Sequence, residues 1–365
     1  MTLHTDILII GGGISGLLVA REMHLAGRNV TIIDQSSLGS ESSWAGGGIL
    51  LPIYPWRQAE AISDLVLISL AMYPQLSHEL LTETGIDPEW HPCGMLICKN
   101  PDIESATNWC QTRQVRHLTP PASLLKDLNS TLEQPLWLPD IAQARNPRLL
   151  KSLIAFLKQH GVRFVEQGQI NAVELDQHQI RRLRIGEQDY SAEQVVLCTG
   201  AWTGDFLLRW LPQSAIRLKI QPVRGQMLLF DAKPDTLTHM VLDGDHYLIP
   251  RRDGKILAGS TVEQVGFEKL TTLEARQQLY SFATELLPSL KQYPVCAHWA
   301  GLRPGTPDGV PYIGYHPDID NLAINAGHFR NGLVMGPASA RLLADLILGR
   351  TPCTDPAAYA LDRAH

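Results

Sequence analysis

Three glycines near the N-terminus have the spacing that binds a nucleotide phosphate. Gly11, Gly13 and Gly16 form a G-x-G-x-x-G pattern, and Asp34 follows them. In this pattern the first glycine permits a tight turn, the second lets the backbone approach a pyrophosphate, and the third lets a helix pack closely on a strand. A helix N-terminus offers N–H groups and partial positive charge to the phosphates. An acidic side chain such as Asp34 accepts hydrogen bonds from ribose hydroxyls.

The segments around these glycines occur in the order that dinucleotide binding requires. Residues 6–10 are a short β-rich run, the helical pattern after it ends at Gly27, and residues 30–33 form a second strand that Asp34 follows. This βαβ context favours a dinucleotide site over a glycine-rich turn in some other α/β fold. By itself it does not distinguish FAD from NAD.

Length, charge and cysteine usage exclude several classes of protein. The 365 residues predict about two domains, and the net charge of −6 argues against a nucleic-acid partner. No apolar run approaches the ~18 residues of a membrane span, and the N-terminus lacks a secretory signal. None of the six cysteines forms a C-x-x-C pair or a zinc template. We therefore expect reduced thiols, no metal and a cytoplasmic location.

The rest of the chain predicts a second, antiparallel unit. Helical patterns cover residues 61–84, 147–160 and 273–287, and residues 195–202 read as a buried strand of the first sheet that ends in a glycine turn. Residues 223–230 alternate like an antiparallel strand, and residues 246–250 and 255–259 flank an Asp-Gly turn, which is typical of a hairpin. Alternation places Tyr247 and Ile249 on one hairpin face.

Three further expectations concern residues 88–139, the C-terminal helix and residues 42–50. Residues 88–139 are rich in Pro, Thr and Trp without a clear period, and we expect irregular structure and loops there. In the C-terminal region we expect Pro337 to open a helix and Gly349 to close it. Residues 42–50 combine small residues with Trp44, Ile49 and Leu50, which favours a packed loop over a flexible linker.

Several motifs occur together in one order along the chain. They are the N-terminal fingerprint, the 42–50 loop, Thr199-Gly200-Ala201-Trp202, Gly301-Leu302-Arg303-Pro304 and Gly327-His328-Phe329-Arg330-Asn331-Gly332. Together they resemble the FAD-dependent D-amino acid oxidase superfamily, and most closely its ThiO-type glycine oxidases, over essentially the whole chain. The resemblance implies an α/β (α+β two-domain) fold, with a Rossmann-like FAD-binding domain and an antiparallel-sheet substrate domain. The FAD-binding domain would be 1–85, 145–215 and 300–365, and the substrate domain 86–144 and 216–299.

The resemblance also implies where ligands bind. Non-covalent FAD would contact Gly11, Gly13, Ile14, Ser15, Gly16, Asp34, Gln35, Ser42, Ser43, Gly47, Gly48, Ile49, Ile170, Gly200, His328, Phe329, Arg330, Asn331, Gly332, Leu333 and Val334. Arg303 would bind the substrate carboxylate with help from Tyr247, and Arg330 would stand close by. The chain departs from the family at two positions. Asp34 replaces the commoner glutamate, and Val262 occupies a pocket position where a larger residue such as Met occurs.

The implied reaction is oxidation of glycine, or of sarcosine or a small D-amino acid, to an imine, with glyoxylate, ammonia and hydrogen peroxide as products. The partners would be the small amino acid and O₂, with a possible homo-oligomer and a role in thiamine biosynthesis. The alternatives are a sarcosine or D-amino acid oxidase, a dehydrogenase, the FAD-dependent enzyme that modifies tRNA wobble uridines, and a flavin-binding regulator without turnover.

Overall fold

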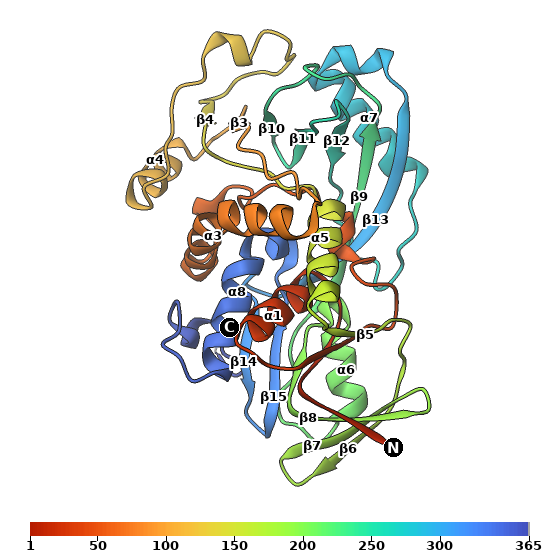
Figure 1. The fold of residues 1–365 in the computed structure, drawn as a ribbon. Coiled ribbons are helices and arrows are strands. Elements are labelled where there is room, and N and C mark those ends of the chain that lie inside the picture. The colour runs from red at the N-terminus through yellow and green to blue at the C-terminus, as the bar shows by residue number, and fades with distance from the viewer. Residues whose placement is uncertain (364–365) are drawn as a thin grey trace.

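The computed structural model describes residues 1–363, and an eight-stranded sheet forms the lower half of the molecule in Figure 1. Its main path runs β14-β15-β8-β1-β2-β5, and the β6–β7 hairpin joins it beside β8. The strands are β1 (Thr2–Ile10), β2 (Val30–Ile33), β5 (Arg163–Val165), β6 (Ile170–Asp176), β7 (Gln179–Ile185), β8 (Gln188–Leu197), β14 (Tyr312–His316) and β15 (Ile319–Ala326). The central strand β1 is parallel to β2 and β8, as the βαβ pattern predicts.

The first sheet is covered on both faces, which explains why the C-terminal parts of its central strands, residues 7–10 of β1 and 195–197 of β8, are wholly apolar. Ile7 and Ile9 of β1 belong to the core that includes helices α1 (Ile14–Leu25), α3 (Glu60–Thr84), α5 (Asn146–Gln159) and α8 (Gly332–Ile347). Leu8 and Ile10 belong to the opposite core, with α6 (Thr203–Trp210) and the β6–β7 hairpin.

A seven-stranded sheet forms the second unit, in the order β13-β9-β12-β11-β10-β3-β4 (Figure 1). Its strands are β3 (Met95–Ile97), β4 (Leu136–Leu138), β9 (Gln221–Phe230), β10 (Met240–Asp243), β11 (His246–Pro250), β12 (Ile256–Gly259) and β13 (Val295–Gly305). Helix α7 (Leu273–Leu286) packs on one face. Every strand pair is antiparallel except β10 with β3, so the predicted antiparallel unit and the β11–β12 hairpin are confirmed.

The expectation for residues 88–139 is wrong in part. This segment holds α4 (Ile103–Thr112) and contributes β3 and β4 to the second sheet. Strands of three residues are too short to show a period. They form because neighbouring strands supply their hydrogen bonds: β10 pairs with β3, and β3 pairs with β4. In the 42–50 loop the chain forms the short helix α2 (Ser42–Ala45) and is otherwise packed, as expected.

The sequence predicts that Pro337 opens the C-terminal helix. The structure shows instead that Pro337 lies inside α8. Proline has no N–H and therefore leaves the carbonyl of Leu333 without its helical donor. The hydroxyl of Tyr73 on α3 donates to that carbonyl at 2.6 Å. The N–H of Ala338 donates to the hydroxyl of Ser69 at 2.9 Å. Helix α3 thus replaces the bonds that a proline would otherwise remove.

Replacing Tyr73 with phenylalanine is expected to destabilise the protein. The carbonyl of Leu333 would then be buried without a donor, which costs about 1–3 kcal/mol. We expect the free energy of unfolding in urea to fall by that amount. Tyr280→Phe is the control, because the Tyr280 side chain is 38% exposed and its loss should leave stability unchanged. Equal stability of Tyr73→Phe and the parent protein would contradict this account of the proline.

No helix within residues 1–363 is long and apolar enough to cross a membrane. All six cysteines are free thiols, as expected. The domain division inferred from the sequence remains a prediction, and the long strand β13 extends across its boundary between residues 299 and 300.

Candidate active site

A cavity of about 810 Å³ lies between the two sheets and is lined by residues of both. It lies at the carboxyl ends of β1, β2, β8 and β15, where open α/β sheets bind ligands, and it reaches β9, β11 and β13 of the second sheet. The volume is in the range of small-molecule and cofactor sites. The predicted site residues that line it are Gly11, Gly13, Ile14, Ser15, Asp34, Gln35, Ser42, Ser43, Gly47, Gly48, Ile49, Ile170, Gly200, Tyr247, Arg303, His328, Phe329, Arg330, Asn331, Gly332 and Leu333.

Three residues expected at the site lie outside the cavity lining. A Cβ on Gly16 would lie 1.9 Å from the carbonyl oxygen of Gly11, so this glycine serves the close packing of α1 on β1. The side chain of Val334 is buried one turn into α8 and packs in the core. Val262 is 52% exposed, so it does not set the size of the pocket.

The glycine loop is held in a fixed shape. Gly11 has a φ of +105°, and a Cβ there would lie 2.4 Å from the carbonyl oxygen of Cys198. The carboxylate of Asp34 accepts from the N–H groups of Gly12 and Ser36, both at 2.7 Å, through separate oxygens. Burial raises the pKa of Asp34, and those two hydrogen bonds oppose the shift. Each oxygen keeps a further lone pair, so Asp34 both fixes the loop and is able to accept from ribose hydroxyls.

The 42–50 loop closes over the start of α1. The hydroxyl of Ser43 accepts from the N–H of Ile14 at 2.9 Å, and the amide of Asn146 donates to the carbonyl of Ser43 at 2.7 Å. Among the described residues, the remaining amide oxygen of Asn146 is buried without a partner, and so are both amide atoms of Asn325 at the end of β15. Both asparagines line the cavity. Buried polar groups without partners are rare, so these atoms indicate a polar ligand such as a dinucleotide.

Arg303 lies at the other end of the cavity and is fixed rather than free at the surface. Its guanidinium donates to the carbonyl of Thr261 at 3.0 Å and to the hydroxyl of Ser260 at 2.8 Å. The hydroxyl of Tyr247 lies beside it. Burial lowers the pKa of Arg303 to about 10, Tyr247 opposes that shift, and the positive charge of Arg330 adds to it. The group nevertheless stays charged at neutral pH.

The two arginines give this end of the cavity an uncompensated positive charge. Within residues 1–363, no ion pair links Arg303 or Arg330 to an acidic side chain, and one Nη of Arg330 is buried without a partner. A guanidinium fork binds a carboxylate through two parallel hydrogen bonds, so an anionic ligand fits here.

A glycine that sequence reasoning missed makes room for this arginine. A Cβ on Gly225 of β9 would lie 2.1 Å from Nη2 and 2.2 Å from Cζ of Arg303. The guanidinium therefore lies against bare backbone of the neighbouring strand, where Gly225 pairs with Gly301. A glycine inside a strand signals such a close approach, so the sequence held the clue.

Most of the other lining residues belong to no motif, Trp202 of the Thr199–Trp202 motif being an exception. Trp202, Asp205, Phe206, Arg209 and Trp210 line the cavity from the segment that leads into and forms α6, and Tyr54, Arg57, Gln58 and Asp245 line it from loops of both sheets. The amide oxygen of Gln58 accepts from the amide of Asn331 at 3.1 Å, and the hydroxyl of Tyr54 donates to the carbonyl of Gly244 at 2.9 Å. Only the tertiary structure brings these residues together.

The histidines near the site are placed for packing rather than for proton transfer. His328 is buried against the hydroxyl of Ser339 at 3.1 Å, and burial lowers its pKa to about 4, so it is neutral at physiological pH. His246 lies on the opposite face of β11 from Tyr247, and its ring packs on Phe282 with centroids 5.0 Å apart.

Comparison with known proteins agrees with this geometry. The family model described as FAD dependent oxidoreductase matches residues 6–346. A glycine oxidase of Pseudomonas aeruginosa is 42% identical over 97% of this chain and 98% of its own length. The bifunctional protein ThiO/ThiG of Synechocystis is 32% identical over 94% of this chain. The match covers 52% of that longer protein. The crystal structure of glycine oxidase from Geobacillus kaustophilus superposes with a TM-score of 0.92 at 26% identity, with 100% of both chains covered. The chain therefore belongs to the FAD dependent oxidoreductase family.

Proposed function

We propose that this enzyme oxidises glycine, with sarcosine and small D-amino acids as further candidate substrates, and that O₂ is its electron acceptor. The products would be the imine, which water converts to glyoxylate and ammonia, and hydrogen peroxide. The observation that carries the proposal is Arg303, a half-buried and oriented guanidinium that lies in the same cavity as the nucleotide loop and forms no ion pair with an acid of residues 1–363. A carboxylate is the anion that matches it.

The cavity fits FAD by its donor and acceptor set. The glycine loop and the N-terminus of α1 would hold the pyrophosphate, Asp34 the ribose, and residues 47–49 and 328–333 the ring system. Bound FAD supplies the electron acceptor for the hydride of the substrate α-carbon. The N-terminal residues Gly332 and Leu333 of α8 line the cavity, and the N–H groups of this helix end favour negative charge there.

The protein residues position the substrate rather than exchange its protons. Arg303 would fix the carboxylate by two hydrogen bonds, and Tyr247 would donate a third from the hydroxyl beside it. Holding the α-carbon in one orientation accounts for much of a rate enhancement, because the entropy of alignment is lost on binding. If the amine enters neutral, the reaction needs no general base, which agrees with the neutral His328.

Anaerobic mixing of the purified protein with glycine tests the proposal directly. We expect the visible absorbance of the bound flavin to bleach and then to recover when air is admitted. No recovery would identify a dehydrogenase. A yellow protein that ignores glycine but bleaches with sarcosine or a D-amino acid would change the substrate. A salt-sensitive tRNA complex would instead favour the tRNA-modifying enzyme, against which the net charge of −6 argues.

Replacing Gly225 with alanine is expected to weaken substrate binding through Arg303. The added methyl group would displace a guanidinium that now lies 2.1 Å from that position. We expect KM for glycine to rise at least about tenfold, with a smaller change in kcat, because lost alignment costs about 1–3 kcal/mol. Adding Gly225→Ala to Arg303→Ala should change nothing further. Additive effects of the two substitutions would contradict this role of Gly225.

We also propose that the enzyme acts in the cytoplasm and supplies the synthesis of the thiazole ring of thiamine. The free state of all six cysteines and the similarity to bifunctional ThiO/ThiG proteins support these assignments. Sedimentation would test the homo-oligomer that the resemblance implies.

A further inference from the structure

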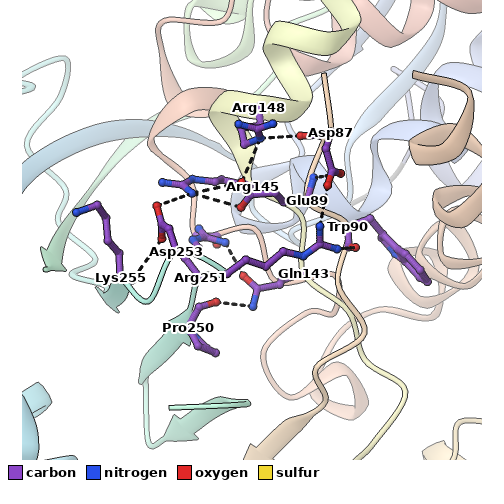
Figure 2. Close-up of polar contacts among 12 residues, drawn as sticks. Asp87, Glu89, Trp90, Gln143, Arg145, Arg148, Pro250, Arg251, Asp253 and Lys255 are labelled. Atoms are coloured by element: carbon purple, nitrogen blue, oxygen red, sulfur yellow. Dashed lines mark hydrogen bonds and ion pairs between the residues drawn. The ribbon is translucent and has the colours of Figure 1, made fainter. Parts of the chain in front are cut away.

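A half-buried arginine outside the cavity holds the loop that lines it. Arg251 follows β11 directly, and its Nη2 donates to the carbonyl oxygen of Gly47 at 2.7 Å. Its Nη1 donates to the amide oxygen of Gln143 at 2.6 Å (Figure 2). Arg251 does not line the cavity, whereas Gly47 and Gly48 do. The guanidinium of Arg251 thus binds the 42–50 loop from outside the cavity.

Alternation along β11 explains how Arg251 reaches this loop. Tyr247, Ile249 and Arg251 are two residues apart, so their side chains share one face of the strand. A Cβ on Gly47 would lie 2.9 Å from Cδ1 of Ile249 and 3.2 Å from Cε2 of Tyr247. The strand that presents Tyr247 to the substrate end of the cavity therefore also packs on the 42–50 loop and anchors it at Gly47.

The surroundings of Arg251 fix its side chain without neutralising it. Gln143 is itself held, because its amide donates to the carbonyl of Pro250 at 2.6 Å (Figure 2). The nearby acids are engaged elsewhere, since Arg145 pairs with Asp253 at 2.9 Å and with Glu89 at 3.3 Å. Within residues 1–363, Arg251 forms no ion pair of its own. Its bond to the Gly47 carbonyl is therefore a charge-assisted hydrogen bond with a fully charged donor.

The peptide between Gly47 and Gly48 connects the side of the loop that Arg251 contacts to the opposite side. The carbonyl of Gly47 and the N–H of Gly48 belong to one planar trans peptide and point in opposite directions. Because the carbonyl points to Arg251, which does not line the cavity, the N–H of Gly48 points away from Arg251, and Gly48 itself lines the cavity. The carbonyl of Gly48 accepts from the N–H of Ala144 at 2.9 Å, while the N–H of Gly48 has no acceptor in the described chain.

We propose that Arg251 is a positioning residue that presets the N–H of Gly48 as a polarised donor to the ring system of bound flavin. A cation on the carbonyl side strengthens the N–H as a donor, because hydrogen bonds in a chain polarise one another. A preset donor favours the form of the ring that carries more negative charge, which is the reduced form. This inference rests on the FAD of the family and not on the choice of glycine as substrate.

The midpoint potential of the purified holoenzyme, measured against redox dyes without substrate, tests the proposal. In Arg251→Gln we expect the preference of the protein for reduced over oxidised flavin to fall about tenfold, which is about 30 mV for a two-electron couple. The matched control is Arg252→Gln, because the neighbouring Arg252 is exposed and, within residues 1–363, bonds only to Asp87 and to the carbonyl of Trp90. The control should keep the parent potential and visible spectrum.

Two results would overturn the proposal. One is an unchanged potential in folded, FAD-loaded Arg251→Gln, and the other is an equal fall in Arg252→Gln. If Arg251→Gln does not fold, Gln143→Met replaces it, since it keeps Arg251 and removes the second anchor of the guanidinium together with the bond of Gln143 to the Pro250 carbonyl. That variant should shift the potential in the same direction by less, and no shift would refute the proposal. A protein that ignores glycine but shows the shift would refute the proposed substrate alone.

Discussion

Arg303→Ala is expected to lose nearly all turnover of glycine while keeping its flavin. Truncating one partner of a buried charge pair costs about 3–5 kcal/mol, so kcat/KM should fall by about two to three and a half orders of magnitude. The loss is large because the guanidinium is already oriented by Thr261 and Ser260, and no neighbouring acid competes for it. Steady-state oxygen uptake with glycine measures the effect.

Two further variants separate a binding role from a structural one. Arg303→Lys keeps the charge but loses the two-pronged contact, so its activity should lie between those of the parent and of Arg303→Ala. Arg252→Ala removes an exposed arginine from the same sheet and should leave turnover unchanged. Visible spectra and melting temperatures establish that each variant is folded and loaded with FAD. Near-normal kcat/KM in folded Arg303→Ala would refute the carboxylate site.

Gly16→Ala is expected to prevent tight binding of FAD. The new methyl group would lie 1.9 Å from the carbonyl oxygen of Gly11, so α1 must move away from β1 and take its N-terminal N–H groups with it. Overpacking of this kind costs about 1–3 kcal/mol of stability, and the displaced phosphate site adds to the loss. We expect the Kd of the apoprotein for FAD to rise at least about a hundredfold, as measured by quenching of flavin fluorescence.

The control for this substitution is Gly204→Ala in α6. A Cβ there would meet only backbone oxygens at 3.5 Å, which is ordinary contact, and alanine favours a helix over glycine. Its FAD affinity should equal that of the parent, and its stability should be equal or higher. If Gly16→Ala bound FAD as tightly as Gly204→Ala, the close approach of helix and strand would not matter for the cofactor.

Local patterns in the sequence were sufficient for the nucleotide end of the site. The glycine fingerprint, the β1 run before it and the acid after it are neighbours along the chain, and each follows from backbone sterics or alternation. The β11–β12 hairpin was equally readable, because an Asp-Gly turn and period-two strands are local signals. The family resemblance added Arg303, Tyr247 and Arg330, and the structure brings all three to one cavity. Their roles toward ligands remain predictions.

Tertiary structure decided what depends on residues far apart in the chain. Pro337 continues a helix because Tyr73 supplies the missing donor. β3 becomes a strand because β10 lies beside it, and β4 because β3 does. The hold of Arg251 on Gly47 is likewise visible only in the fold, and the fold identifies Arg303 as the group for which Gly225 leaves space. The periodicity of a sequence does not indicate which distant residues a side chain contacts. Only the packing of the two sheets fixes which backbone group each arginine meets.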